Sequence, residues 1–522
     1  MTADTDRRGR SRILLLLHSH LPYVPASRQG LTLEETWLYQ NLTECYLPLA
    51  MMLRELSAST TPFGVTVSLS PTLLSMTQNP GHIRGYRRYL DMLFRLLSAK
   101  TVMRDSDAAG ARAHLERRVT EIRRRFDEIG GHIVDEWRSL ARDPRITFIT
   151  TRATHAILPA YRFSTSLVRL QVETGLRYFE SALGFRPDGF WLPEMAYYEG
   201  LDSVLRKCGI RYTFLDTGGL YGAGLPPAHG CFQPYVTESE LLLFPRDAEL
   251  SGAIWSAREG YPGDFRYREF HYDYTWSLTE SELAAENIGR MPAGLKLYRI
   301  TGGDTPKQFY DPREAANAVT SHARDFIRRV SMRAASISEI AGITPLFTLP
   351  FDAELFGHWW YEGPEFLQSV IEAAAHSNIE CVTPNFFTAE GTYSRLLPTE
   401  SSWGRNGAFE TWLNPECEPI YHRIADLYTR LIRTPSSGPM AKAQQCAFRE
   451  LLLAQSSDWP FFIAWKTSAD YGRLRLREHL DAAETILRGM EAGTINNAYL
   501  LERERRYPLF VGTPGKPPCE SD

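Results

Sequence analysis

Short apolar runs that end abruptly in polar residues recur along this chain and restrict the folds open to it. Seven such runs occupy residues 12–17, 64–69, 146–149, 189–192, 211–215, 297–300 and 346–349. Helix-like stretches separate several of them, for example residues 164–183, which stop at Gly184. Apolar strands that alternate with helices are typical of a parallel α/β sheet or barrel, in which ligands bind at the carboxyl ends of the strands. The pattern therefore predicts an α/β fold whose polar strand ends gather around one site.

Two regions interrupt this alternation. Residues 83–143 are arginine-rich and carry apolar residues at helical spacing, which predicts a helical insertion. From about residue 415 onward no strand-like run remains, and amphipathic patterns predict helices instead. We expect a barrel domain over residues 10–400, a helical C-terminal domain over 410–510 and a flexible tail over 511–522.

Composition narrows the functional classes. The formal net charge of -4 gives no electrostatic reason to expect nucleic acid or an anionic membrane as a partner. The seven cysteines are dispersed without a C-x-x-C pair, which argues against a disulfide framework and against a cysteine metal site. Residues 13–17 form an apolar run too short for a signal peptide or a membrane span, so we expect a cytoplasmic protein. We expect no cofactor.

Two carboxylate motifs carry the strongest chemical signal. Asp352 and Glu354 directly follow one apolar run and precede two tryptophans, while Glu194 ends another run that contains Trp191. Carboxylates serve as acid, base or nucleophile, and indole faces bind sugar rings by stacking. Two carboxylates on separate strand ends, each beside tryptophan, predict carbohydrate chemistry. The competing interpretation of Glu194 is a buried carboxylate paired with an arginine such as Arg246.

A pair of histidines suggests either a metal ion or a sugar as ligand. His18 and His20 lie two residues apart on an extended segment, so their imidazoles point to the same side. That spacing can hold a metal ion, with His155 or an aspartate as the third ligand. No H-E-x-x-H-type motif accompanies it, and histidines are also ordinary partners of sugar hydroxyls. We favour hydrogen bonding to substrate and expect no metal site.

Other segments allow two interpretations each. Residues 246–249 and 402–407 are charged or glycine-rich loops near aromatic residues, and taken alone they indicate solvated turns. Ser457-Asp458-Trp459 has two equally good explanations. Either Asp458 caps a helix and Trp459 is a core residue, or the segment is part of the site. Residues 218–238 include a long Gly- and Pro-rich loop after a predicted strand end, a position that favours a lid over the site.

Several motifs occur in an order that resembles a known family. The matching segments are 18–23 (HSHLPY), 190–194 (FWLPE), 246–249 (RDAE), 298–302 (YRITG), 351–360 (FDAELFGHWW), 412–415 (WLNP) and 457–459 (SDW). In these segments the chain resembles glycoside hydrolase family 57 and, within that family, its 1,4-α-glucan branching enzymes. The segments span nearly the whole chain, so the resemblance is far more specific than any single motif.

The resemblance implies a distorted (β/α)7 barrel with a helical insertion and an all-helical C-terminal domain. It also implies a retaining transglycosylase, with Glu194 as the nucleophile and Asp352 as the general acid/base. Such an enzyme cleaves an α-1,4 linkage and transfers the chain to a glucan 6-hydroxyl, which forms an α-1,6 branch. The two carboxyls of a retaining pair lie about 5–5.5 Å apart. The alternatives on the same scaffold are a 4-α-glucanotransferase and an α-amylase.

The motifs and the resemblance together predict the residues that contact substrate. These are His18, His20, Trp37, His155, Trp191, Arg246, His358, Trp359, Trp403, Trp412, Asp458 and Trp459. The family's branching enzymes carry a loop tyrosine linked to transfer over hydrolysis, and its counterpart here is Tyr235 or Tyr221. The family often has Asp-Thr-His where this chain has Asp-Thr-Gly at residues 216–218, which puts the expected loop conformation in question. The expected partner is an α-1,4-glucan such as glycogen, with a polymethylated glucose polysaccharide as the alternative.

Overall fold

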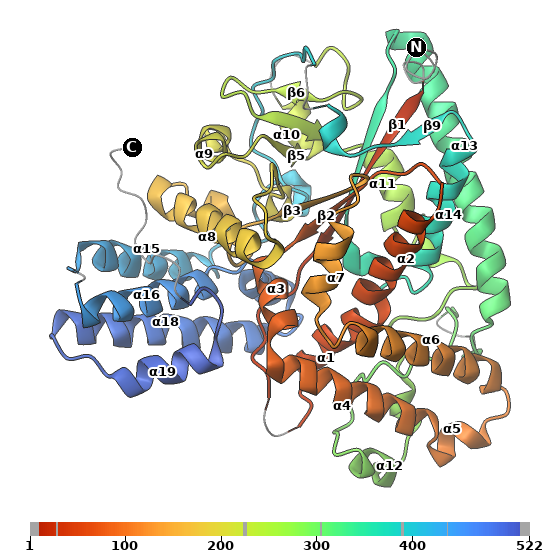
Figure 1. Cartoon of the computed structure of the whole chain (residues 1–522), viewed down its shortest axis with the longest axis horizontal. Helices are drawn as coiled ribbons and strands as arrows, with labels where there is room; N and C mark the ends of the chain where they lie inside the picture. The colour runs from red at the N-terminus through yellow and green to blue at the C-terminus, as the bar shows by residue number, and fades with distance from the viewer. Residues whose placement is uncertain are drawn as a thin grey trace.

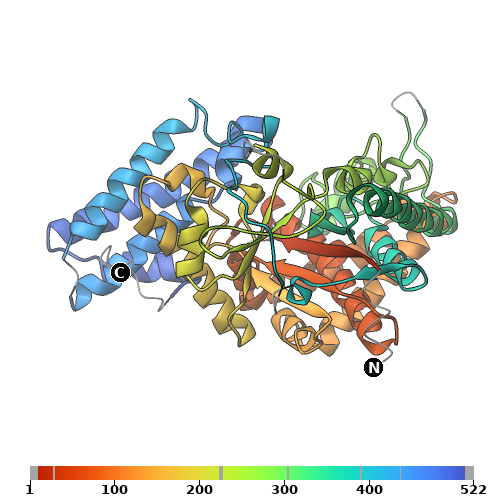
Figure 2. The same ribbon diagram turned by 90° about the horizontal axis from the view of Figure 1, so that it is seen from above.

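The computed structural model describes residues 10–27, 30–222, 227–302, 305–387, 391–435 and 437–511. A barrel of strands lies between a group of C-terminal helices at one end and the 30-residue helix α13 (Pro312–Ala341) at the other (Figures 1 and 2). The predicted tail at 511–522 lies outside the described residues, apart from Val511. No helix within the described ranges combines the length and the apolar character that a membrane crossing requires.

Seven parallel strands form the barrel in the described part of the chain. In spatial order they are β1 (Ser11–Ser19), β2 (Val65–Leu69), β3 (Ile146–Thr150), β4 (Gly189–Phe190), β5 (Tyr212–Leu215), β7 (Leu242–Pro245) and β8 (Leu346–Asp352). β8 pairs with β1, and a parallel bridge between Arg246 and Thr348 joins the end of β7 to β8. The ring of strands therefore closes as a distorted barrel of seven strands, the predicted architecture.

The prediction of a strand at residues 297–300 is wrong. Residues 297–300 form only isolated bridges, from Tyr298 to Phe309 and from Arg299 to Arg268, and residues 298–300 are half-buried. The strand at this place in the barrel is instead β7, a short and fully buried run of Leu-Leu-Phe-Pro. Two further strands join the sheet: β6 (Tyr235–Val236) runs antiparallel to β7, and β9 (Ile379–Cys381) pairs with the start of β1.

Successive side chains of β1 point alternately into two separate parts of the hydrophobic core. Leu14 and Leu16 pack with side chains from the other strands, including Trp191 and Phe214, in a cluster inside the barrel. Their neighbours Ile13, Leu15 and Leu17 pack into the larger cluster formed with the helices. Successive side chains of a strand point to opposite faces, so a strand with both faces covered must be apolar throughout. This explains why the strand sequences show continuous apolar runs.

Helices connect and cover the strands. They are α2 (Leu47–Ala58), α3 (Pro71–Gln78), α8 (Thr165–Leu183), α9 (Leu201–Lys207), α10 (Thr217–Tyr221), α11 (Ala248–Trp255), α12 (Glu280–Ala285) and α14 (Gly363–Ala375), together with α13. The Ser164 side chain accepts a hydrogen bond from the Leu167 amide and caps α8. Gly184, with φ of 89°, ends the same helix in the left-handed conformation that glycine tolerates.

Both regions predicted to be helical are helical. Between β2 and β3 the chain forms α4 (Pro80–Leu97), α5 (Lys100–Arg104), α6 (Ala109–Glu128) and α7 (Ile133–Leu140). The C-terminal part consists of α15 (Glu418–Arg433), α16 (Pro439–Ala454), α17 (Asp458–Trp465), α18 (Ala469–Glu491) and α19 (Asn497–Arg506). Its helices lie beside α8 at one end of the barrel (Figure 1).

Candidate active site

Glu194 follows the short strand β4 and lies in a strained turn. Its φ and ψ are 60° and 17°, and the next residue, Met195, also has a positive φ of 49°. A non-glycine residue in this conformation costs on the order of 1 kcal/mol and persists only when the surroundings hold it. Trp403 holds it here, because its backbone amide donates to the Glu194 carbonyl (3.0 Å) and its indole Nε1 donates to Oε2 (2.7 Å). These two hydrogen bonds therefore hold the turn and orient the Glu194 carboxyl.

Asp352 is the last residue of β8 and faces the same cavity as Glu194. It is in register with His18 on the neighbouring strand β1. Burial, and then the charge of Glu354, raise the pKa of Asp352 well above its ordinary value, although Arg246 opposes this. Burial, and then the charge of Asp352, raise the pKa of Glu194 to about 8. Two neighbouring acids with raised pKa values keep a proton on at least one of them near neutral pH, as an acid/nucleophile pair requires.

Glu354 also lines this cavity, two residues after Asp352, and two hydrogen bonds hold its side chain. Its carboxylate accepts a hydrogen bond from the Tyr46 hydroxyl (2.5 Å) and another from the His20 amide (3.0 Å). Burial raises the pKa of Glu354 to about 7, while the Tyr46 hydroxyl opposes the rise. Both of these contacts orient the carboxyl of Glu354, and its charge in turn raises the pKa of Asp352.

Two of the histidines form a continuous hydrogen-bonded chain. His18 Nδ1 bonds to Ser68 Oγ (3.0 Å), and its Nε2 bonds to His155 Nε2 (2.9 Å). His155 Nδ1 bonds in turn to Ser457 Oγ (2.8 Å), at the C-terminal side of the cavity. Burial lowers the pKa of both histidines well below the ordinary value, and neighbouring histidines lower it further. Both rings are therefore neutral, and one proton lies between the two facing Nε2 atoms.

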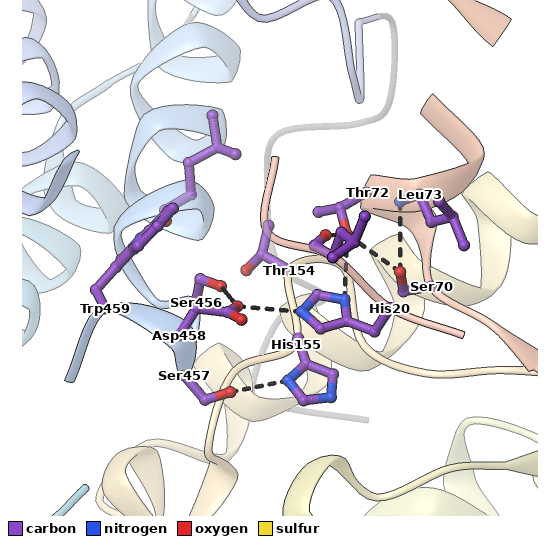
Figure 3. Close-up of polar contacts among 12 residues, drawn as sticks. His20, Ser70, Thr72, Leu73, Thr154, His155, Ser456, Ser457, Asp458 and Trp459 are labelled. Atoms are coloured by element: carbon purple, nitrogen blue, oxygen red, sulfur yellow. Dashed lines mark hydrogen bonds and ion pairs between the residues drawn. The ribbon is translucent and has the colours of Figure 1, made fainter. Parts of the chain in front are cut away.

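Figure 3 shows the third histidine, His20, pointing toward Asp458 at the start of α17. The distance from His20 Nε2 to Asp458 Oδ2 is 3.1 Å, and Ser456 donates to the same oxygen (2.5 Å). The imidazole of His20 stacks on that of His155, with 3.8 Å between ring centroids and 8° between planes. These contacts bring the C-terminal helices directly into the site.

Among the described residues, His20, His155 and Asp458 form a group that could hold a metal ion. One ligand atom from each lies within 4.8 Å of the other two. However, every ring nitrogen of the two histidines already has a protein hydrogen-bond partner, with Thr72 completing the set at 3.4 Å from His20 Nδ1. A metal ion would have to break these bonds. The ring nitrogens of both histidines are therefore held by protein groups, and Asp458 is tied to His20 and Ser456.

Exhaustive chelation is expected to leave the activity unchanged. Because the ring nitrogens are engaged with protein groups, removal of divalent cations takes away nothing that the site uses. Initial rates before and after dialysis against a chelator measure this directly. A loss of activity that zinc restores would instead identify His20, His155 and Asp458 as a metal site.

Glu44 organises the opposite wall from a single turn of π-helix, η2 (Leu42–Tyr46), which follows α1 (Leu33–Asn41). It accepts hydrogen bonds from Arg268 (2.5 Å) and from His358 Nδ1 (2.7 Å), and Lys296 Nζ lies 3.7 Å away. Burial lowers the pKa of His358, so the ring is neutral and its Nδ1 proton points to Glu44. The other nitrogen, Nε2, is left as an acceptor. π-turns often occur at functional sites, and this one supplies both Glu44 and Tyr46.

Replacement of Glu44 by glutamine is expected to lower the free energy of unfolding by about 3–5 kcal/mol at pH 7, because two buried cations lose their counter-charge. Burial alone would raise the pKa of Glu44, but Arg268, Lys296 and His358 lower it below the ordinary value of 4.5. A carboxylate with a depressed pKa stabilises the fold above its unfolded pKa, and this contribution fades as the pH falls. Urea unfolding at pH 7 and pH 4 measures the loss. The exposed Glu116 on α6 provides the control Glu116→Gln, for which a change under about 0.5 kcal/mol is expected.

Six tryptophans and two phenylalanines line the cavity, which has a volume of about 810 Å³. Trp37 comes from α1, whereas Trp403 comes from the loop before α15. Among the tryptophans that line the cavity, the most exposed are Trp255 (38%), Trp359 (41%) and Trp465 (48%). Exposed indole faces around a polar floor are suited to sugar rings, which present an apolar face and polar edges.

Twelve of the sixteen residues predicted for the site line this cavity. They are His18, His20, Trp37, His155, Glu194, Arg246, Asp352, His358, Trp359, Trp403, Trp412 and Asp458. The cavity lining also includes aromatic residues that sequence reasoning missed, namely Phe461, Phe462 and Trp465 of α17, together with Trp255 of α11. The sequence signal for these residues was the large number of aromatic residues in α17, whose sequence is DWPFFIAW. For Glu44, which follows Gln40, Asn41 and Thr43, the sequence offered no comparable signal.

The other four predicted residues do not line the cavity. Trp191 is buried inside the barrel, 5.1 Å from the His18 ring and 5.2 Å from Trp403 between centroids, so it supports the site from below. Trp459 is a core residue whose Nε1 donates to the Leu453 carbonyl (2.8 Å), because its place on α17 turns it away from Asp458. The hydroxyl of Tyr235 donates to the Gly230 carbonyl (2.8 Å), and Tyr221 is half exposed at the end of α10.

The predicted lid over the site is not seen in the described part of the 218–238 loop. None of its described residues, 218–222 and 227–238, lines the cavity. Asp216 caps α10 by accepting from the Gly218 amide (3.1 Å), so the Asp-Thr-Gly sequence begins a short helix here. Residues 223–226, which the lid prediction also includes, lie outside the described residues.

This barrel with its helical C-terminal part has counterparts among known proteins. The model of glycosyl hydrolase family 57 matches residues 14–396, which is more than half of the chain. The chain belongs to glycosyl hydrolase family 57. A second model, described as the C-terminal part of 1,4-alpha-glucan branching enzymes, matches residues 420–512.

Relatives within family 57 cover almost the whole chain. The 1,4-alpha-glucan branching enzyme of Thermococcus kodakarensis is 28% identical over 96% of this chain and 78% of its own length. A probable 1,4-alpha-glucan branching enzyme of Mycobacterium tuberculosis is 30% identical over 93% of each protein. Among solved structures, the alpha-amylase AmyC of Thermotoga maritima has a TM-score of 0.89 at 30% identity, covering 97% of this chain and 98% of its own. The GH57-type branching enzyme of Pyrococcus horikoshii has a TM-score of 0.87 at 28% identity, covering 98% of each chain.

Proposed function

We propose that this family 57 protein is a 1,4-α-glucan branching enzyme that acts by a retaining double displacement. One observation carries the proposal: Glu194 and Asp352, from separate strand ends, face a single aromatic-walled cavity that helix α17 completes. The match of residues 420–512 to the C-terminal part of branching enzymes supports the choice among activities. In this proposal Glu194 is the nucleophile and Asp352 is the general acid/base.

In the first step, a Glu194 carboxylate oxygen attacks the anomeric carbon of an α-1,4-linked glucose. Asp352 gives its proton to the glycosidic oxygen as that bond breaks, so a glycosyl–enzyme ester forms and the rest of the donor chain leaves. The indole N–H of Trp403 bonds to Glu194 Oε2 and favours its ionised form. The raised pKa of Asp352 keeps a proton available for the leaving group.

In the second step, Asp352 takes the proton of a glucan 6-hydroxyl, whose oxygen attacks the anomeric carbon and releases Glu194. The product is an α-1,6 branch with the original α configuration, because inversion has occurred twice. For this outcome the acceptor chain must reach the ester before water does. The aromatic wall, with Trp255, Trp359 and Trp465 exposed at the cavity, offers surfaces on which a second glucan chain can stack.

Further parts of the proposal concern substrate, location and domains. The acceptor is a glycogen-like α-1,4-glucan, with a polymethylated glucose polysaccharide as the alternative. A cytoplasmic location is proposed because the six cysteines in the described residues are free thiols, and disulfides mark oxidising compartments. We place the barrel domain at residues 10–400, with the insertion at 83–143 and the C-terminal domain at 410–510. The family 57 and branching-enzyme matches at 14–396 and 420–512 support this division.

A second candidate function is hydrolysis, because the alpha-amylase AmyC is as similar in structure as the branching enzymes are. Product analysis on amylose separates the two. A branching enzyme produces new α-1,6 linkages, seen by proton NMR and as short chains released by a debranching enzyme, with few new reducing ends. Reducing ends that accumulate without α-1,6 linkages would establish an amylase, and new α-1,4-linked chain lengths alone would indicate a 4-α-glucanotransferase.

A further inference from the structure

A second and larger cavity, of about 1300 Å³, lies on the other side of an aromatic wall of the active-site cavity. It is formed by residues 24–27, the start of α1, the junction of α3 with α4, and helices α18 and α19. No proposed catalytic residue lines it. Its size exceeds that of the cavity assigned to the reaction, so it has room for several sugar rings.

Aromatic packing between the two cavities gives them a common wall. Trp37 and Phe462 line the active-site cavity, and Tyr471, at the start of α18, lines the second one. The ring of Trp37 contacts that of Tyr471 edge-to-face at 5.5 Å between centroids, and it lies 5.7 Å from Phe462. Glu34, one helical turn before Trp37 on α1, faces the second cavity. A chain bound in the second cavity therefore lies one side chain away from the active site.

The deep side of the second cavity is a fixed network of charges. Glu478 accepts hydrogen bonds from Arg475 (2.5 Å), from Arg503 (2.9 Å) and from the hydroxyl of Tyr507 (2.7 Å). Arg475 is only 2% exposed, and its Nε has no hydrogen-bond partner among the described residues. Polar groups that are already held in place lose little freedom when a ligand binds.

The rim of the second cavity carries charges of both signs. Arg84 and Arg88 lie one turn apart on the same face of α4, and both are exposed. Within the described residues neither has an ion-pair partner, and Glu34 and Glu502 also face the cavity. In all, five arginines and three glutamates line it, with apolar surface from Pro25, Pro80, Tyr471 and Leu474. Donors and acceptors next to apolar surface suit an uncharged ligand that presents many hydroxyl groups.

We propose that this second cavity is a binding site for an α-glucan chain, separate from the site of bond cleavage. The choice of an α-glucan as the ligand rests on the proposed function. A polymer held there keeps its other segments close to the active site, which raises their effective concentration. Short oligosaccharides that fill only the active-site cavity gain nothing from it. The second cavity therefore makes the enzyme favour long chains over short ones.

The test compares Arg84→Ala/Arg88→Ala with Arg324→Ala, which replaces an exposed arginine on α13 at the other end of the molecule. In a Glu194→Gln background, affinity electrophoresis through gels containing glycogen measures polymer binding without turnover. The double variant is expected to bind glycogen at least fivefold more weakly, and Arg324→Ala is expected to match the parent. In the active background, the ratio of kcat/KM on amylose to kcat/KM on an aryl maltotetraoside is expected to fall at least fivefold.

The proposal would be overturned if glycogen in the gel slowed Arg84→Ala/Arg88→Ala as much as it slows the parent protein. The proposal also fails if inorganic phosphate raises the Tm of the parent but not that of the double variant while glycogen binding is equal, because the cavity is then an anion site. Electrophoresis does not depend on the reaction catalysed. If product analysis finds no α-1,6 linkages while the binding difference persists, the branching function fails and the second glucan site stands.

Discussion

Glu194→Gln is expected to lower kcat on amylose by about four to six orders of magnitude, the loss typical when a covalent nucleophile is removed. Glutamine keeps the size of the side chain and can still accept the indole hydrogen bond of Trp403. It cannot form the glycosyl ester, so both steps of the double displacement stop. Formation of α-1,6 linkages, followed by debranching and chain-length analysis, measures the loss.

Two controls make the Glu194 result specific. Glu116→Gln, on the exposed side of α6, removes a carboxylate far from the cavity and is expected to keep wild-type turnover. Glu194→Gln itself is expected to bind maltoheptaose with an affinity within about threefold of wild type. A variant that retains more than a tenth of wild-type turnover would remove Glu194 from the role of nucleophile.

Asp352→Asn is expected to lower kcat/KM on amylose by about 10²- to 10⁴-fold, the contribution of a positioned proton donor. The loss should be much smaller for the first step on a glucoside with a good leaving group, because such a group departs without a proton. Stopped-flow measurement of aryl release separates this step from the second. Equal losses on both substrates would show that Asp352 does not protonate the leaving oxygen.

The charges in the cavity also predict how kcat/KM of Asp352→Asn depends on pH. The negative charge of Asp352 contributes to the raised pKa of Glu194, which is about 8. Neutral asparagine removes that contribution, so Glu194 ionises at lower pH and the acid side of the profile shifts downward. The alkaline decline, which reports loss of the proton from the pair, should disappear. A profile that keeps the wild-type alkaline decline would assign that proton to another group.

Strand ends were the most predictable part of the site. A continuous apolar run must stop where the chain leaves the barrel, so the polar residues that follow it, such as His18, Glu194 and Asp352, gather at one edge. Strand identity was less predictable. Residues 297–300 and 242–245 are both short apolar runs, and only packing with the neighbouring strand shows which of them enters the barrel.

Neighbouring residues in one motif can have different surroundings, which sequence alone does not reveal. Asp458 enters the cavity while Trp459, the next residue, is buried in the core, because consecutive positions on a helix point about 100° apart. Glu44 escaped notice for a related reason. Its contact with His358 depends on a π-turn, and no local pattern in the sequence marks that geometry.

The hydrogen bonds from His20 to Asp458 and from His155 to Ser457 join the barrel to a segment that is synthesised late. Ribosomes make the chain from its N-terminus, so both reactive carboxyls exist once residue 352 has been made, more than one hundred residues before Asp458. A nascent chain in that interval contains the proposed nucleophile Glu194 and the proposed acid Asp352, but not the cavity wall that α17 supplies. Under the proposed function, the complete site therefore forms only after α17 has been made and has folded against the barrel.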